Sequence, residues 1–135
     1  MKKILFTCFC VAFVAFSSCV KPGKGGKAIL SIHVFEGVSP CDENDKTVVP
    51  NAIVYIKYGG TNMDTDVSNY DDSQLTDFGG KTVFTNLKRG EYYLYAVKDT
   101  IILVNSVLVN KIFTGGAEFD IRNRIGEREI VICAN

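Results

Sequence analysis

Hydrophobic and polar residues alternate with the two-residue period of β-strands along most of the chain after residue 27. In AILSIHVFE (28–36), the even positions from Ala28 to Val34 share one face, and Ile29, Ser31, His33 and Phe35 share the other. Strand character returns in 51–58, 81–87, 91–98, 117–123 and 127–134, with a short edge strand near 73–76. The apolar stretch 100–113 is either one long bent strand or two short strands broken near Asn105 and Ser106.

No segment has the sustained 3.6-residue period and the caps that predict a helix. About seven short strands punctuated by Gly, Asn and Asp instead predict an all-β chain, folded as an antiparallel Greek-key β-sandwich.

The first residues do not follow this pattern. Lys2 and Lys3 precede an apolar run from residue 4 to 16, and Ser17, Ser18 and Cys19 follow it. A basic start, a short apolar run and small residues are typical of a secretory signal, and the run is shorter than the ~20 residues that span a bilayer. The sequence FSSC resembles the lipobox of bacterial lipoproteins, in which the cysteine receives a diacylglycerol. The alternative is an ordinary signal peptide that ends near a cysteine.

The lipobox interpretation divides the chain into three parts. We expect residues 1–18 to be a leader, residues 19–27 to be a lipidated cysteine with a flexible tether, and residues 28–135 to be the β-sandwich domain. Val20 stands where an Asp would imply inner-membrane retention, and no acidic run follows it. By resemblance to other lipoproteins, this implies that the protein is anchored in the outer membrane, with its domain facing the periplasm or exposed at the cell surface.

Charge and cysteine content narrow the function classes. Of 15 basic and 15 acidic residues, the leader removes Lys2 and Lys3, which leaves 13 basic against 15 acidic. This balance gives no indication of a nucleic-acid partner. Once the leader is cut and Cys19 is lipidated, Cys41 and Cys133 remain as a candidate disulfide for an oxidising compartment. Such a bond would close a loop of about 92 residues, for which chain entropy predicts ~4–5 kcal/mol; two buried free thiols are the alternative.

A family resemblance is carried by residues 50–97, PNAIVYIKYGGT…LTDFGGKTVFTNLKRGEYYLYAV. This text resembles the transthyretin-like (prealbumin-like) sandwich domains, which include the carboxypeptidase regulatory-like repeats. The matching positions are Ala52, Val54, Thr76, Asp77, Gly80, Phe84, Leu87, Gly90 and Tyr92. The resemblance implies a turn at 76–80, with Phe84 and Leu87 in the core and Tyr92, Leu94 and Ala96 facing inward. It describes a scaffold and does not assign a function.

Candidate chemistry is sparse. His33 is the only histidine, and without a base–nucleophile partnership it favours a protein that is not an enzyme. Two cysteines and one distant histidine do not make a metal site, so we expect no cofactor and no metal.

Two surfaces remain as candidate contact sites. The long acidic segment 59–80 contains Asp64, Asp66, Asp71 and Asp72, which could converge on a ligand only if the loop folds back on itself; solvated acidic loops are the alternative. Tyr93 and Tyr95 point outward if Tyr92 and Leu94 point inward, and Tyr55 lies on a nearby strand. Exposed tyrosines can bind sugar rings or a protein partner.

The sequence therefore predicts a non-catalytic envelope lipoprotein, anchored to the membrane by its lipid, whose sandwich is a structural or protein-interaction module. The alternative is a binding module for a glycan or another small ligand, which would use the exposed tyrosines or the 59–80 loop.

Overall fold

The computed structural model describes residues 20–37, 47–123 and 125–133. Its strands are β1 (Lys24–Gly37), β2 (Thr47–Val48), β3 (Ile53–Tyr58), β4 (Asp72–Leu75), β5 (Lys81–Leu87), β6 (Gly90–Val104), β7 (Val107–Ile121) and β8 (Ile125–Cys133), and the short 3₁₀ helix η1 covers Val67–Asn69.

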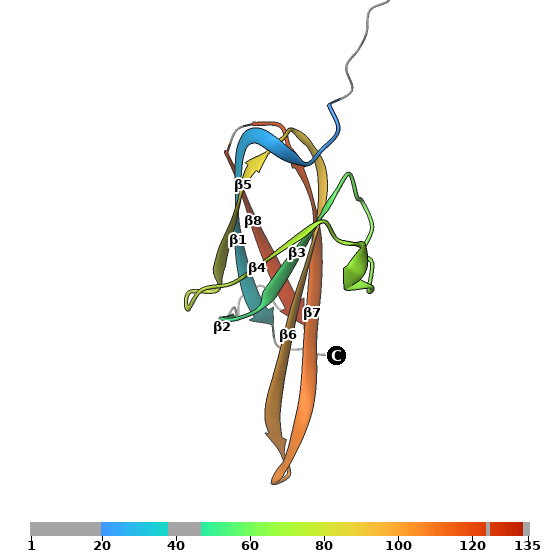
Figure 1. The fold of residues 1–135 in the computed structure, drawn as a ribbon. Coiled ribbons are helices and arrows are strands. Elements are labelled where there is room, and N and C mark those ends of the chain that lie inside the picture. Colours follow the sequence, from blue (N-terminus) through green and yellow to red (C-terminus); the bar gives the residue numbers. More distant parts are fainter. Residues whose placement is uncertain (1–19, 38–46, 124, 134–135) are drawn as a thin grey trace, which may run out of the picture.

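The strands form two layers (Figure 1). One layer has the order β4-β3-β6-β7, and the other has the order β5-β1-β8, with β2 beside the end of β1. Thr114 of β7 pairs with Cys133 of β8 and connects the two layers. The expected all-β sandwich is confirmed, with eight strands where the sequence predicted about seven.

The core lies between the layers and contains the residues that the alternation predicts. The even positions of β1 from Ala28 to Val34 are at most 3% exposed, and Tyr92, Leu94 and Ala96 of β6 face them with no exposed surface. Phe84 and Leu87 complete this cluster, so their expected core positions are confirmed.

The two ends of the domain lie side by side, because β1 and β8 pair in parallel over nine positions, from Ile29–Ile125 to Gly37–Cys133. This arrangement places Cys133 opposite the residue at which β1 ends. Cys19 and Cys41 lie outside the described residues, so the lipidation and the Cys41–Cys133 disulfide stay predictions.

The start of the domain differs from the sequence expectation. β1 begins at Lys24 and not at Ala28. Ahead of it, the Gly23 N–H donates to the Tyr92 hydroxyl (3.0 Å), and the Lys88 N–H donates to the Gly23 carbonyl (2.8 Å). The expected tether 19–27 is therefore too long, because its Gly- and Lys-rich residues are already part of the sheet.

The hairpin of β6 and β7 is longer than the sequence predicted. Breaks were expected between 98 and 100 and between 113 and 117, but both strands run through them, and the only turn is at Asn105 and Ser106. Both turn residues have positive φ (48° and 65°), as the hairpin turns that match strand twist require. Gly115 and Gly116 lie inside β7 and do not end it. These positions have no room for a side chain: a Cβ would lie 2.4 Å from the Val131 carbonyl oxygen at Gly115 and 2.4 Å from the Tyr93 hydroxyl at Gly116.

The hairpin leaves the sandwich beyond its neighbours. β3 pairs with β6 only as far as Val97, and β8 pairs with β7 at Thr114. The remaining residues, 98–113, form a two-stranded arm (Figure 1). At its base Phe113 is part of the core cluster and Lys98 donates to the Pro50 carbonyl (2.8 Å), and the rest of the arm extends from the body. We call residues 98–113 the arm.

The two tyrosine hydroxyls beneath the N-terminal segment make a matched stability test. The Tyr92 hydroxyl accepts from Gly23 and donates to the Lys88 carbonyl (2.7 Å), whereas the buried Tyr58 hydroxyl has no hydrogen-bond partner among the described residues. The two rings are in edge-to-face contact at 5.8 Å. We expect Tyr92→Phe to lower the free energy of unfolding by ~1–3 kcal/mol, because it leaves buried backbone groups unpaired. Tyr58→Phe should be neutral or stabilising; equal losses in urea denaturation of the two variants would contradict this assignment.

Candidate functional site

The outer face of β3 and β6 carries the tyrosines that the sequence singled out. Tyr55 and Tyr95 are directly opposite each other, with ring centroids 6.4 Å apart. Tyr70, from the loop between β3 and β4, lies against both rings at 5.7 and 5.8 Å. Tyr95 is therefore only 6% exposed and Tyr93 only 9% exposed.

The expectation of an exposed tyrosine face is thus wrong for Tyr93 and Tyr95. Both side chains point away from the main core, as the alternation predicted, but the 59–71 loop returns across the sheet and covers Tyr95 with the ring of Tyr70. Tyr93 packs over Gly116 of the neighbouring strand. Of the three tyrosines that the sequence singled out, Tyr55 alone is half-buried and keeps part of its surface open.

Asp64 and Asp66 hold this loop in shape. The Tyr70 hydroxyl donates to the Asp64 carbonyl (2.9 Å) and accepts from its N–H (3.1 Å). The Asp64 carboxylate accepts from the Asp66 N–H (3.0 Å) and from the Asn69 side chain (2.7 Å). The Asp66 carboxylate accepts from the Ser68 N–H (3.0 Å) and hydroxyl (2.7 Å), so it caps η1.

Asp71, at the end of the loop, and Asp72, the first residue of β4, bind other partners. Asp71 accepts from the Tyr58 N–H (2.6 Å), and Asp72 forms an ion pair with Lys24 (2.7 Å). The four aspartates therefore do not converge on one point, and the described residues contain no group of three or more side chains that could hold a metal ion. These carboxylates order the loop over the tyrosines.

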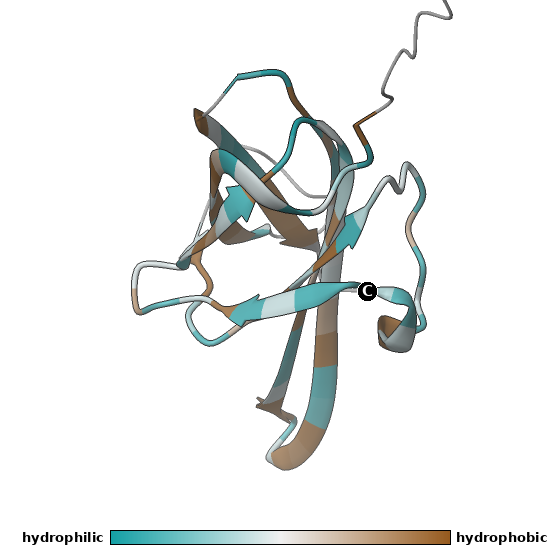
Figure 2. Ribbon diagram, turned by 45° about the horizontal axis from the view of Figure 1, so that its top comes forward, coloured by the Kyte–Doolittle hydropathy of each residue, from teal (hydrophilic) through white to brown (hydrophobic). Residues whose placement is uncertain are grey.

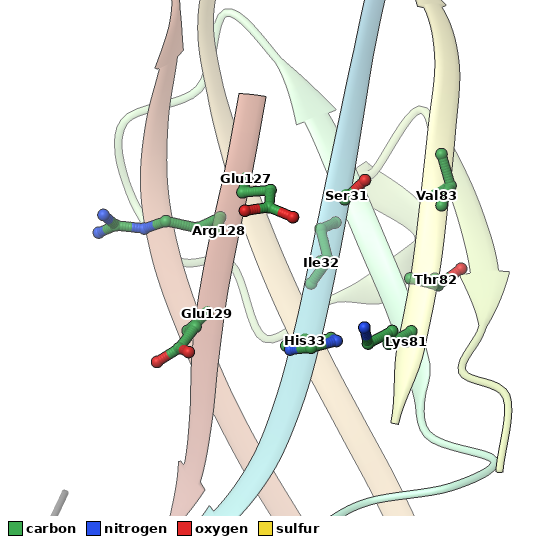
Figure 3. A pocket seen from close by; sticks show the side chains of 9 residues that line it. All are labelled: Ser31, Ile32, His33, Lys81, Thr82, Val83, Glu127, Arg128 and Glu129. Atoms are coloured by element: carbon green, nitrogen blue, oxygen red, sulfur yellow. The ribbon is translucent and has the colours of Figure 1, made fainter. Parts of the chain in front are cut away.

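A second candidate site is a hollow on the outer face of β5, β1 and β8 (Figure 3). Its volume is about 400 Å³. Ser31 and His33 of β1 lie beside Glu127 and Glu129 of β8, and Lys81 of β5 is opposite His33 on the other side. Charged side chains lie on both flanks of the hollow, although apolar atoms make up most of its lining.

Sequence reasoning missed the third and most unusual surface, which is the arm. Figure 2 shows hydrophobic residues along it, away from the core. Seven of its eight large aliphatic residues are 41–71% exposed, and Ile102 is half-buried. The seven are Ile101, Leu103, Val104, Val107, Leu108, Val109 and Ile112. Of the two alternatives for residues 100–113, two strands broken near Asn105 and Ser106 is confirmed. The exposure of these strands was not predicted from the sequence.

Comparison with known proteins identifies the fold and no family. No family model and no curated protein matches the chain. Solved structures that resemble it include the crystal structure of a "putative carbohydrate binding protein" from Pseudomonas aeruginosa, with a TM-score of 0.59 and 10% identity over 82% of this chain and 90% of that chain. At this identity the likeness shows the sandwich fold alone. Within the described residues, no helix is long and apolar enough to cross a membrane.

The loop over the tyrosines should open in acid. Hydrogen bonds from the Asp66 backbone and Asn69 hold the pKa of Asp64 below its usual 3.8, and those from Ser68 lower the pKa of Asp66. Because both pKa values are lower in the folded chain, the two carboxylates contribute fully to stability above the usual pKa, and this contribution is lost as the pH falls through the folded-state pKa values.

All six tyrosines belong to the described domain and the chain has no Trp, so near-UV circular dichroism reports the packing of the tyrosine cluster.

We expect the near-UV signal to decrease below pH 3.8 while the far-UV strand signal is retained. A near-UV signal that stays constant until the whole domain unfolds would contradict this role of Asp64 and Asp66.

Proposed function

We propose that the chain is a lipid-anchored, non-catalytic interaction module of the bacterial envelope, and that the arm is its contact surface. The observation that carries this proposal is the set of seven large aliphatic residues, 41–71% exposed, on an ordered hairpin. Contiguous apolar surface of this kind is rare on monomers and is characteristic of protein interfaces.

The position of the arm supports this function. Pro22 and Gly23 lie at the Gly90 end of β6, whereas the turn of the arm lies at the Val104 end of the same strand. Fifteen residues at ~3.4 Å each separate the two ends by about 45–50 Å. A lipid on Cys19 would hold the first end at the membrane, and the arm would then extend away from it.

The His33 hollow supports a non-catalytic assignment. Ser31 and His33 are two positions apart on β1, so their side chains stand ~7 Å apart, beyond the reach of a nucleophile–base hydrogen bond. His33 instead makes an edge-to-face contact with Phe35 at 5.5 Å.

Site-specific photo-crosslinking in the cells that make the protein tests this proposal. A photoreactive amino acid in place of Leu108, which is 71% exposed, should give a discrete protein adduct. The same group in place of Phe78, which is 91% exposed on the turn before β5, should give none. A Cys19→Ala variant should leave the membrane fraction and lose the adduct. Absence of any Leu108 adduct, or equal adducts at both positions, would contradict the proposal.

Glycan binding is the second candidate function. It is favoured by the fold likeness to a "putative carbohydrate binding protein" and by the charged side chains that flank the hollow at His33. Tyr93 and Tyr95 are at most 9% exposed and offer no platform, so this function would use Ser31, His33 and their flanking charges. Saturable binding on a glycan array that His33→Ala weakens at least about tenfold would support it, and no saturable binding would exclude it.

A further inference from the structure

The arm has two faces that differ in composition. Residues directly opposite each other in an antiparallel pair point to the same side of a sheet, so the register defines each face. The outer face continues from the tyrosine side of β6, and its members are Asp99, Ile101, Leu103, Leu108, Asn110 and Ile112. The inner face continues from the core side, and its members are Thr100, Ile102, Val104, Val107, Val109 and Lys111.

The outer face is the more exposed of the two. Its four aliphatic residues are 58–71% exposed, whereas the three valines of the inner face are 41–61% exposed. At its base the inner face also merges with the sandwich core through Phe113, which is 7% exposed. The outer face therefore presents the larger apolar surface to a partner.

The backbone of the arm argues against lipid as the occupant. Neither β6 beyond Val97 nor β7 before Thr114 has a second neighbouring strand among the described residues. Every second N–H and C=O group along both edges therefore needs water, and hydrocarbon cannot supply it. The partner of the outer face must leave these edges in water, as another protein surface does.

The order of residues along the outer face fits a second copy of the same arm. From base to tip its cross-strand pairs are Asp99–Ile112, Ile101–Asn110 and Leu103–Leu108, and the polar turn at Asn105 and Ser106 follows. If two arms lie antiparallel, the Asp99 end of each meets the polar turn of the other, and the Leu103–Leu108 pair of each meets the Ile101–Asn110 pair of the other. If they lie parallel, the two Asp99 carboxylates face each other and repel.

We propose that two copies of the chain associate through the outer faces of their arms, antiparallel about a two-fold axis perpendicular to them. This inference rests on the proposed function, since it names the partner of the same surface. An isologous contact uses one patch twice, so the four aliphatic residues of the outer face, which are 58–71% exposed, contribute from both copies.

The length of the arm limits the overlap. Six residues from Asp99 to Val104 span ~20 Å, so each tip reaches the base of the other arm. Tyr95 lies four residues further along β6. The tyrosine cluster and its covering loop therefore stay outside the contact, and the two sandwiches lie at opposite ends of the dimer.

Two double variants at the same depth in the arm make a matched test. Leu103 pairs with Leu108 on the outer face, and the adjacent pair Val104–Val107 lies on the inner face.

Sedimentation velocity on residues 20–135, which contain every strand of the structure, should show a concentration-dependent monomer–dimer equilibrium. Leu103→Lys with Leu108→Lys should weaken dimerisation by at least about a hundredfold, because each copy then buries two ammonium groups in the apolar part of the contact. Val104→Lys with Val107→Lys should change the dissociation constant by less than about threefold.

Near-UV circular dichroism matching that of the wild type would establish that both variants are folded. A monomer at all concentrations, equal weakening by the two variants, or open-ended association would overturn the inference. Flotation with phosphatidylethanolamine–phosphatidylglycerol vesicles, lost only in the outer-face variant, would overturn it in favour of lipid.

The two proposals can fail separately. A monomeric protein that still forms a Leu108 adduct with a different envelope protein would remove the dimer and keep the interaction module. A dimer in solution with no Leu108 adduct in cells would support self-association and remove the proposed function.

Discussion

The pairing of β6 with β7 is the interaction on which the rest of the structure depends. Fifteen consecutive residue pairs join these strands, from Gly90–Ile121 to Val104–Val107. The first half of this ladder supplies Tyr92 and Leu94 to the core and carries β3 on its edge. The second half is held by the same backbone hydrogen bonds but has no second layer among the described residues. One continuous hairpin therefore provides both the centre of the sandwich and its most exposed apolar surface.

Much of the fold could be predicted from local pattern. The alternation in β1 identified the buried face correctly, and the matched positions Phe84 and Leu87 are in the core. The errors came from glycine and charge, which locally indicate turns. Gly115 and Gly116 lie inside β7 because the β8 backbone and the Tyr93 ring come too close for a side chain, and these neighbours are more than ten residues away in the sequence.

The candidate sites could be predicted less well, because exposure is a property of the tertiary structure. Alternation placed Tyr95 on the outer face of its sheet, but only the path of the 59–71 loop decides that Tyr70 covers it. The aspartates of that loop resembled a set of metal or ligand contacts, yet the Asp64 and Asp66 carboxylates accept hydrogen bonds from N–H groups of the loop itself. For the arm, the Asn105–Ser106 break could be predicted, but nothing local shows that the pairing of β3 with β6 ends at Val97 and that of β8 with β7 at Thr114.

Amide hydrogen exchange of the wild-type protein, at a concentration where it is monomeric, tests the central claim most directly. A continuous hairpin predicts that the amides of residues 98–104 and 107–113 that point across the β6–β7 ladder are protected, though less than those of residues 92–97 in the sandwich. The amides on the open edges of the arm should exchange rapidly. If every amide of the arm exchanged at the rate of an unstructured peptide, the hairpin would end at the sandwich, and the account of the arm as an ordered contact surface would be wrong.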